Sequence, residues 1–573
     1  MQLLTNHLGY ECRGPKLAVI KGPILNARYV ELRHLNDQRL VLQLPLPACG
    51  PVAQWHTGEY ASIDFSHMCD EGEYYLQVGE HVSHPFRVTE GLLHKPFSDL
   101  LHYFKSQRCS GRFDSADRNA KRYQTDETID VHGGWYDASG DVSKYLSHLS
   151  YANHLNPQQI PMVVWNMLAS LTLQPEQPAY TQARLLDEAL YGCDFLTRMQ
   201  SSDGYFYMTV FDKWSKNPQQ RDICAYKTQD GHKSNAWQAA FRQGGGVAIA
   251  ALAKAANLNN NPSYCSLYDA DPAPLATYLA AAEQGYWHLR EHNLAYLDNG
   301  EENIIDEYCA LLAATELYRT TQHSRYLAEA RIWAERLCQR QGSDQNFEHF
   351  WLASAERPYY HAAEAGLPVI ALLQYLEVET DRSKAPTVQA VVENALRFEL
   401  NISQEVHNPF GYPRQYVQPV GGDKQSQFFI PHNNESGYWW QGENARLASL
   451  VSMALLALPY IDDDALKHAL RQYASQSLNW ILGLNPYDMS MLDGHGHNNP
   501  DYLPELGFYN AHGGVCNGIT SGFENEADIA FKPEGQKDDM LQNWRWGEQW
   551  IPHGAWLLLA IAAHSKEYHD EQL

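Results

Sequence analysis

The sequence lacks long apolar runs, an excess of positive charge and closely paired cysteines, and each absence excludes a class of protein. Its longest apolar stretches, such as Trp556 to Ala563, are far shorter than the ~20 residues of a membrane-spanning helix. Lys and Arg number 43 against 68 Asp and Glu, and the formal net charge of −25 would repel nucleic acids and anionic membranes. The ten cysteines form no CxxC pair, so we expect reduced thiols. The sequence therefore predicts no nucleic-acid partner and no membrane partner.

Three familiar sequence signals are also missing. The amino-terminal residues show no basic segment followed by an apolar run, which predicts the absence of a secretory signal and a cytoplasmic location. Gly244 to Gly246 opens an apolar helix, but no P-loop Lys-Ser/Thr follows and no strand precedes it, so we interpret the glycines as a site of close helix packing. No GxSxG motif indicates a serine nucleophile.

Residues 1–88 differ from the rest of the chain in the pattern of their apolar residues. Short alternating runs, such as Lys16 to Ile20 and Tyr74 to Val78, are separated by Gly, Pro and Asn, which are strand and turn signals. Several such strands in a short segment predict a small β-sandwich that closes near Pro85 to Val88.

From about residue 95 the apolar period changes to three and four residues, which is typical of helices. About twelve helices are predicted, near 96–108, 160–172, 184–200, 246–257, 274–291, 305–321, 325–340, 362–377, 386–399, 442–457, 464–482 and 552–565. Helices without alternating strands predict a helical bundle, a solenoid or a barrel of helical hairpins. No internal repeat is visible, which weakens the solenoid interpretation.

Long loops rich in aromatic residues interrupt these helices. They span 109–150, 200–243, 400–440 and 484–547. Loops of this length inside a compact domain are usually functional or disordered, and their content of Trp, Tyr, Phe and His favours function. A helical scaffold that displays such loops on one rim is suited to binding a ligand.

The loop from Gly133 to Asp141 carries two carboxylates, Asp137 and Asp141, between glycines and next to Trp135 and Tyr136. Glycines permit the bent backbone that would aim both acids at a ligand. The alternative is an ordinary turn in which the two acids accept hydrogen bonds from nearby backbone N–H groups.

Glu548 is the best candidate for a third acid, because three tryptophans lie within four residues of it. Apolar rings around a carboxyl raise its pKa by desolvation, and a general acid must stay protonated near neutral pH. The alternative is that Glu548 only pairs with Arg545, three residues earlier. A carboxylic acid opposite a carboxylate is the arrangement that sugar hydrolysis requires.

The histidines His495, His497 and His512, with Cys516 nearby, allow two interpretations. Imidazole and thiolate are ordinary zinc ligands, so the group could be a metal cluster. However, the His495 to His497 loop lacks the helical spacing of many metal sites, and histidine serves equally well as a hydrogen-bond donor to sugar hydroxyls.

Segments along most of the chain resemble glycoside hydrolase family 9. The similar segments are Asn6 to Tyr10, Tyr103 to Cys109, Gly133 to Asp141, Gly192 to Gln200 with Asp203 and Gly204, Leu482 to Pro486, and Glu548 before the last helix. The resemblance implies an (α/α)6 barrel over residues 89–573, preceded by an immunoglobulin-like β-sandwich over residues 1–88. It also implies hydrolysis of β-1,4-glycosidic bonds with inversion.

The resemblance implies roles for the three acids. Glu548 matches the family's general acid, and Asp137 and Asp141 match the pair that holds the attacking water, of which the second is the base. Ser139 lengthens the usual spacing of the pair from three to four residues, so the sequence leaves open which of the two is the base. Inversion requires base and acid carboxyls roughly 6.5–9.5 Å apart, which leaves room for the water.

Two departures from the family pattern concern the substrate. The family's His-His-Arg segment is replaced by His495-Gly496-His497 and the later His512, and the Tyr five residues after the acid becomes His553. Glu435, in a chain that is acidic overall, could hold a protonated amine by charge-assisted hydrogen bonds. These features resemble the intracellular exo-β-D-glucosaminidase branch and predict an exo-acting hydrolase of chitosan-type oligosaccharides. The alternatives are an endoglucanase or cellodextrinase acting on β-1,4-glucans and, from another class, a catalytically inactive sugar-binding protein.

We expect the β-linked oligosaccharide to contact aromatic, imidazole and carboxyl side chains of the rim loops. The predicted contacts are Tyr136, Glu435, Trp439, Trp440, His495, His497, His512, Trp546 and His553. No cofactor is predicted. The sequence leaves open whether a structural calcium ion is bound, because carboxylate and carbonyl ligands have no fixed spacing outside motifs such as the EF-hand.

Overall fold

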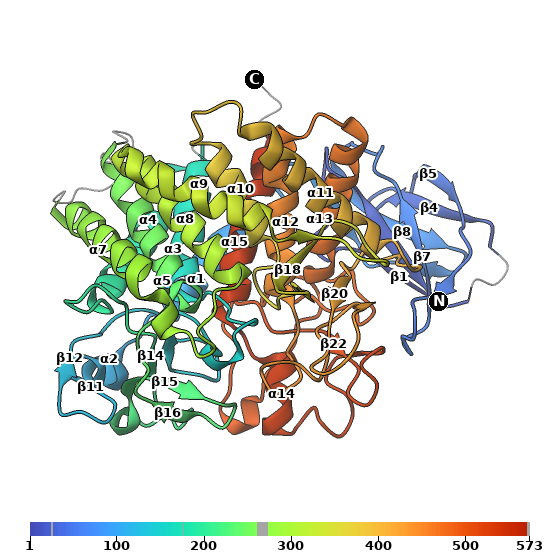
Figure 1. Cartoon of the computed structure of the whole chain (residues 1–573). Helices are drawn as coiled ribbons and strands as arrows, with labels where there is room; N and C mark the ends of the chain where they lie inside the picture. The colour runs from blue at the N-terminus through green and yellow to red at the C-terminus, as the bar shows by residue number, and fades with distance from the viewer. Residues whose placement is uncertain (24–26, 175, 261–272, 570–573) are drawn as a thin grey trace.

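The computed structural model describes residues 1–23, 27–174, 176–260 and 273–569. Strands fill the chain up to Thr89, helices dominate from His94 onward, and the two parts lie side by side (Figure 1). Within the described ranges, no helix combines the length and the apolarity that crossing a membrane requires. No disulfide joins the cysteines of these ranges.

Two sheets pack against each other in the N-terminal part, as the alternating pattern predicts. One has the strand order β1-β3-β7-β6, and the other has the order β2-β10-β8-β4-β5 with β9 beside β8. Side chains from both sheets, such as Ile20 and Leu76, share one apolar core. The strands are β1 (Gln2–Leu4), β2 (Tyr10–Glu11), β3 (Leu17–Lys21), β4 (Tyr29–His34), β5 (Leu40–Pro45), β6 (Gly50–Pro51), β7 (Glu59–Asp64), β8 (Gly72–Val78), β9 (His81–Val82) and β10 (Phe86–Thr89). The arrangement is consistent with the expected immunoglobulin-like domain.

The sheet that contains β3 is buried on both faces. Ala18 and Ile20 point into the sandwich, whereas Val19 joins the core of the helical part, as the two-residue period of a strand requires. Trp55, in the loop before β7, extends this contact, because its ring centroid lies 4.8 Å from that of Phe428. The sandwich and the helical part therefore share apolar side chains.

Six helices form a closed inner ring that packs in the order α3, α5, α8, α10, α12, α15 and back to α3. Inner helices are apolar nearly all round, and α5 is buried along its whole length. Six further helices cover the ring, and these bury one face only, as α4 and α13 do. The inner helices are α3 (Ile160–Leu173), α5 (Gly245–Ala256), α8 (Ile304–Thr321), α10 (Leu367–Leu376), α12 (Asn444–Ala457) and α15 (Ile551–His569), and the outer ones are α1 (His94–Ser106), α4 (Ala179–Arg198), α7 (Ala273–Tyr296), α9 (Ser324–Cys338), α11 (Ala385–Ser403) and α13 (Asp464–Ile481).

This double ring is the expected (α/α)6 barrel, and its members correspond to the twelve helices that the apolar period predicts. The long loops differ from the prediction, because they carry short strands and helices that leave no periodic signature. These elements are α2 (Gly111–Asp117), β11 (Ala120–Arg122), β12 (Thr128–Ile129), β13 (Lys144–Tyr145), β14 (Thr209–Phe211), β15 (Asp222–Lys227), β16 (His232–Ser234), β17 (Gln341–Gly342), β18 (Phe350–Ser354), β19 (Arg357–Pro358), β20 (Gln415–Val417), β21 (Gln425–Gln427), β22 (Thr520–Ser521), β23 (Ile529–Ala530) and α14 (Met540–Gly547). Figure 1 shows α2, β11, β12, β14, β15, β16, β22 and α14 together at one end of the barrel.

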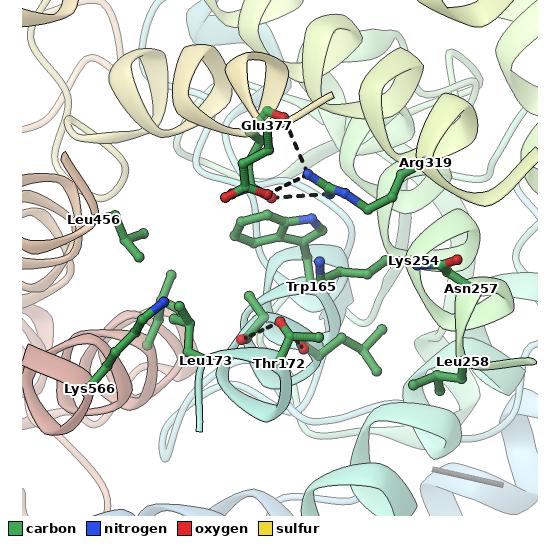
Figure 2. Close-up of a pocket in the computed structure, with 14 residues that line it drawn as sticks. Trp165, Thr172, Leu173, Lys254, Asn257, Leu258, Arg319, Glu377, Leu456 and Lys566 are labelled. Carbon is green, nitrogen blue, oxygen red and sulfur yellow. Dashed lines mark hydrogen bonds and ion pairs between the residues drawn. The ribbon is translucent and has the colours of Figure 1, made fainter. Parts of the chain in front are cut away.

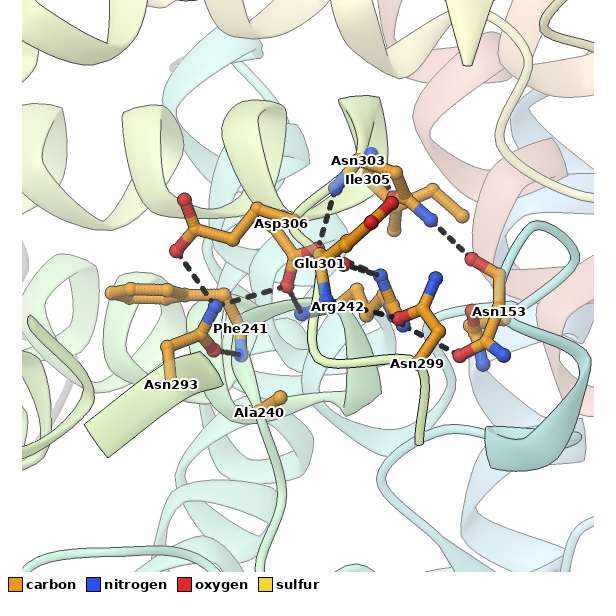
Figure 3. Close-up of polar contacts among 12 residues, drawn as sticks. Asn153, Ala240, Phe241, Arg242, Asn293, Asn299, Glu301, Asn303, Ile305 and Asp306 are labelled. Atoms are coloured by element: carbon orange, nitrogen blue, oxygen red, sulfur yellow. Dashed lines mark hydrogen bonds and ion pairs between the residues drawn. The ribbon is translucent and has the colours of Figure 1, made fainter. Parts of the chain in front are cut away.

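The inner helices begin at this loop-rich end, where polar side chains connect one helix start to the next (Figure 3). Arg242, just before α5, is fully buried and pairs with Asp306 in the first turn of α8 at 3.1 Å. The Arg242 guanidinium also donates to Asn153 of a rim loop at 2.5 Å. Asn303 caps α8 by accepting a hydrogen bond from the N–H of Ile305 at 2.9 Å. The rim loops are thus anchored to the barrel by buried polar contacts.

A cavity of about 320 Å³ lies at the other end of the ring, where the inner helices finish (Figure 2). Lys254 and Arg319 line it, and both pair with the buried carboxylate of Glu316, at 3.1 and 2.7 Å. The Trp165 indole donates to the same carboxylate at 3.0 Å. Cations near helix C-termini are favoured by the helix dipole. This cavity is lined by groups that satisfy one another, and it lies away from the aromatic loops.

Candidate active site

The loop that carries Asp137 and Asp141 is bent at a glycine and closed on itself. Gly134 has a φ of 72°, and a Cβ there would lie 2.9 Å from an aromatic ring, so only glycine fits. Ala138 and Asp141 then exchange backbone hydrogen bonds of 3.1 and 3.2 Å. The turn brings carboxylate oxygens of Asp137 and Asp141 within 4.8 Å of each other.

A buried charge cluster of Asp117, Lys144 and Arg221 supports this loop through contacts with its backbone. Lys144 pairs with Asp117 at 2.7 Å and Arg221 does so at 2.6 Å, and all three side chains are at most 1% exposed. The two cations also donate to backbone carbonyls at both ends of the loop, Lys144 to Gly133 at 2.8 Å and Arg221 to Val142 at 2.8 Å. Although burial alone would raise the pKa of Asp117, the neighbouring cations hold it below its ordinary value.

We expect Asp117→Asn to destabilise the protein by about 3–5 kcal/mol, because it leaves two buried cations without their counter-charge. The midpoint of urea unfolding, measured by circular dichroism, checks this expectation. The matched control is Asp187→Asn, whose side chain is 59% exposed in its pair with Arg108; an exposed ion pair contributes at most about 1 kcal/mol. Equal midpoints for the two variants would contradict the role of the cluster.

Ser139, the residue that lengthens the acidic motif, joins the loop to the segment that carries Glu548. Its N–H donates to the carbonyl of Gln549 at 2.9 Å, and its Oγ accepts from the N–H of Gln549 at 3.0 Å. The extra residue therefore forms a short antiparallel contact between the two acid-bearing segments, which lie about 400 residues apart in sequence.

Gly140 brings Glu548 onto the acidic loop. Its N–H donates to Oε1 of Glu548 at 3.1 Å, and a Cβ at this position would lie 2.3 Å from the same oxygen. The same Cβ would also meet the Tyr502 hydroxyl at 2.9 Å. Any residue larger than glycine would therefore displace the Glu548 carboxyl.

Asp141 is held by three donors. The backbone N–H of Ser143 donates to Oδ1 at 2.8 Å, and the Tyr145 hydroxyl and the Trp214 indole donate to Oδ2 at 2.8 and 3.1 Å. Hydrogen bonds to the ionised form favour ionisation. Burial raises the pKa of Asp141, and the Ser143 N–H and the Tyr145 hydroxyl oppose that shift.

Asp137 lies beside two other acids and neutral hydrogen-bonding groups. It accepts a hydrogen bond from the Gln159 amide, and Nε2 of His148 lies 3.8 Å from its Oδ2. Burial lowers the pKa of His148 to about 3, so its imidazole is neutral and receives the Tyr226 hydroxyl at Nδ1 over 2.6 Å. Burial, followed by the charges of Asp141 and Glu548, raises the pKa of Asp137 well above its ordinary value.

Glu548 meets the requirement for a carboxyl that stays protonated. Burial, and secondly the charge of Asp141, raises its pKa to about 8, while the Gly140 N–H opposes the shift. The alternative of an ion pair with Arg545 is wrong, because the Arg545 guanidinium donates instead to the Trp439 carbonyl at 3.2 Å and to the Gln542 amide oxygen at 2.6 Å.

Several predicted substrate contacts have other partners. Glu435 pairs with Arg357, which also donates to its Oε2 at 3.0 Å. Its charge is therefore already compensated, and its contact with an amine stays a prediction. His553 and Trp546 are fully buried and are corrected: His553 lies 2.9 Å from the Asn517 amide oxygen, and Trp546 donates to a threonine hydroxyl.

The remaining aromatic contacts stay predictions. Trp440 is 4% exposed and stacks on Tyr438 with ring centroids 5.3 Å apart. Tyr136 is half-buried, and its hydroxyl bonds to the backbone of Ser110. Trp439 is half-buried with the Arg545 guanidinium 4.7 Å from its ring.

The structure separates the three histidines of the C-terminal loops. His495 and His512 both meet Oδ2 of Asp99, at 2.9 and 3.0 Å. His497 lies in another cluster, where it pairs with Asp488 at 3.2 Å. Cys516 is buried with its sulfur 3.4 Å from that of Met491. A single metal cluster of three histidines and Cys516 is therefore wrong.

Three groups of side chains in the described ranges have ligand atoms close enough to hold a metal ion. They are His7 with Asp488 and His497, Asp99 with His495 and His512, and Asp137 with Asp141 and His148. The third group coincides with the acidic pair.

Sequence reasoning missed His148, Gln159, Tyr145 and Trp214, which all contact the acidic pair. Trp214 is the most conspicuous, because it is 40% exposed, has a φ of 57° and donates to Asp141. Non-glycine residues with positive φ often mark functional sites. Its only sequence signal is its place in the long loop 200–243.

The site thus places three buried carboxyls around Gly140, and burial raises the pKa of all three. Three donors favour the ionised form of Asp141, whereas the pKa of Glu548 is raised to about 8. Acid–base hydrolysis needs such a difference, because one side protonates a leaving oxygen while the other activates water.

Comparison with known proteins places this geometry in context. The model of the family described as Glycosyl hydrolase family 9 matches residues 94–510. A metagenome-derived glycoside hydrolase family 9 endoglucanase is similar in structure, with a TM-score of 0.68 and 18% identity over 99% of both chains. A Bacteroides ovatus GH9 protein gives the same values. AaCel9A in complex with cellobiose-like isofagomine has a TM-score of 0.65 and 17% identity over 99% of this chain and 100% of its own. A search of curated protein sequences gave no match.

Proposed function

The chain belongs to glycosyl hydrolase family 9 and is a glycoside hydrolase, and from this premise we propose that it hydrolyses β-1,4-linked gluco-oligosaccharides with inversion at the anomeric carbon. Glu548 is the general acid that protonates the leaving oxygen. Asp141 is the general base that takes a proton from the attacking water, and Asp137 helps to hold that water.

One observation carries this proposal: the buried Glu548 carboxyl, whose pKa is raised to about 8, lies across Gly140 from Asp141. At neutral pH the acid keeps its proton, as leaving-group protonation requires. The three hydrogen bonds to Asp141 favour its ionised form, which supports its role as the base. Asp137, whose pKa is raised further by its two acidic neighbours, is the partner more suited to sharing a proton.

The choice of substrate rests on two considerations. Similar structures include an endoglucanase and a protein with a cellobiose-like ligand, which favours a glucan. The glucosaminide interpretation depended on a carboxylate free to meet an amine, and Arg357 already compensates Glu435. We therefore place β-1,4-glucans first and treat chitosan-type oligomers as the alternative.

Cellodextrins and chitosan oligomers of defined length, labelled at the reducing end, test the proposal. We expect release of shorter cellodextrins, with the newly formed α-anomer seen first by NMR. The fragment sizes distinguish endo from exo cleavage. Release of glucosamine alone would replace the glucan assignment, and no release from either series would identify a sugar-binding protein.

A further inference from the structure

The pair of histidines that sequence reasoning grouped with His497 forms a separate site with Asp99, at the surface of the barrel. Asp99 lies on α1, and His495 and His512 lie on two loops that follow α13. The two Nε2 atoms approach the same oxygen, Oδ2 of Asp99, at 2.9 and 3.0 Å. Two imidazoles directed at one carboxylate oxygen form a convergent set of three ligand atoms.

We propose that Asp99, His495 and His512 bind a divalent transition-metal ion, with Zn²⁺ as the preferred ion. Zinc takes imidazole nitrogen and carboxylate oxygen at about 2.0–2.2 Å, so its tetrahedral ligands stand about 3.3–3.6 Å apart. Each Nε2 here lies 2.9 or 3.0 Å from the carboxylate oxygen, and all three ligand atoms lie within 4.8 Å of one another, so small shifts would admit the ion. Two imidazoles favour zinc, cobalt or nickel over calcium and magnesium, which prefer oxygen ligands alone. Water would complete the coordination, because His512 is 48% exposed.

Two glycines allow the surrounding backbone to approach the three ligands closely. Gly494 has a φ of 77°, and a Cβ there would lie 2.0 Å from Nδ1 of His512. Gly513 has a φ of 79°, and a Cβ there would lie 2.2 Å from the backbone oxygen of Asp99. The two glycines allow both loops to press against α1 and against each other. The histidines are therefore held in place by close backbone packing.

The second histidine cluster is less suited to a metal. The rings of His7 and His497 are stacked with centroids 3.6 Å apart, and each donates to a different oxygen of Asp488. In the Asp99 site, by contrast, the ring centroids of His495 and His512 are 5.7 Å apart and both rings face one carboxylate oxygen. His497 also stacks on His84 at 3.8 Å, which fixes its plane. This arrangement is that of a hydrogen-bonded contact between the two domains.

A metal at the Asp99 site would brace the segment that carries the general acid. Gln549, the neighbour of Glu548, accepts from the N–H of Ala511 at 2.8 Å and donates to its carbonyl at 2.8 Å. Ala511 is adjacent to His512. The ion would thus tie α1 to the loop that supports Gln549, and this inference does not depend on the proposed substrate.

Calorimetric titration of the full-length, chelator-treated protein with Zn²⁺ tests the site, together with Co²⁺ titration followed by visible absorption. We expect one equivalent of Zn²⁺ to bind at this site, the d–d bands of low-symmetry Co²⁺ to appear, and the Tm to rise on Zn²⁺ addition. His512→Ala and Asp99→Asn should each weaken binding by at least about 100-fold, because even loss of an outer-shell partner costs 10- to 100-fold.

Two control variants locate the ion. His232→Ala removes a remote histidine whose side chain is 66% exposed and should bind as the unaltered protein does. His497→Ala should also leave binding unchanged. Loss of binding in His497→Ala with retention in His512→Ala would overturn the proposal in favour of the interdomain cluster. Failure of the unaltered protein to bind Zn²⁺ or Co²⁺ would overturn it outright, and circular dichroism confirms that each variant is folded.

Discussion

Glu548→Gln is expected to lower kcat on cellodextrins by about 10²–10⁴-fold, because it removes the proton that the leaving oxygen must receive. The amide keeps the shape of the carboxyl and can still accept the Gly140 N–H, so the fold should survive. Steady-state kinetics on a substrate with an alkoxide leaving group measure the loss. The control is Glu534→Gln, which makes the same residue exchange at a side chain that is 87% exposed and should leave kcat unchanged.

The pH dependence gives a second readout of the same group. With its pKa raised to about 8, Glu548 loses its proton as the pH rises through that value. We therefore expect kcat/KM to decrease above about pH 8, which is the alkaline limb of the profile. Protonation of the base should produce the acidic limb. A profile whose alkaline limb persists unchanged in residual Glu548→Gln activity would contradict the assignment.

The Glu548→Gln substitution should change stability and activity in opposite directions. The folded state holds the Glu548 proton between the ordinary carboxyl pKa and about 8, whereas the unfolded state has lost it. Stability therefore falls as the pH rises across this window. Glu548→Gln removes that penalty and should have a Tm at pH 7 equal to or above that of the unaltered protein. A clearly lower Tm would point to a structural role.

Asp141→Ala is expected to cause a loss of similar size, about 10²–10⁴-fold in kcat, because water is then no longer deprotonated as it attacks. Azide should restore turnover of a β-glycosyl substrate with a good leaving group and give the α-glycosyl azide, since the small anion replaces the activated water. NMR of the product identifies the anomer.

Asp137→Ala is the matched comparison, because the two acids share one loop and nearly the same burial, 4% and 6% exposed. We expect a smaller loss of kcat in this variant and no rescue by azide. Rescue of Asp137→Ala together with no rescue of Asp141→Ala would exchange the two roles and show that the inserted Ser139 has moved the base to the first position.

The helical period and the strand alternation predicted the fold well. Both are local spacings of apolar side chains, and the face on which these side chains lie is the face that becomes buried. The helices of the barrel and the strands before Thr89 follow from such patterns. The short strands in the loops could not be predicted, since β13 and β14 hold two or three residues each and exist only through their partners.

The candidate site was predictable only in part. Asp137, Asp141 and Glu548 could be found because acids beside glycines and tryptophans are unusual in sequence. Glu435 and His553 could not be judged, because the arginine that neutralises the first and the amide that meets the second come from distant segments. The same limit applied to His495 and His512, whose partner Asp99 lies about 400 residues earlier.

By itself, the sequence determined the barrel helices and the strands before Thr89 and singled out three acids as candidates, because residue type and period indicate which side chains are buried. Only the tertiary structure decided how these acids are tuned. Contacts between remote segments bury Glu548 against Gly140, add the Trp214 indole to the local donors of Asp141 and give Ser139 its place between the two acid-bearing segments. A pKa depends on every group that surrounds a carboxyl in space, and sequence order does not specify those neighbours.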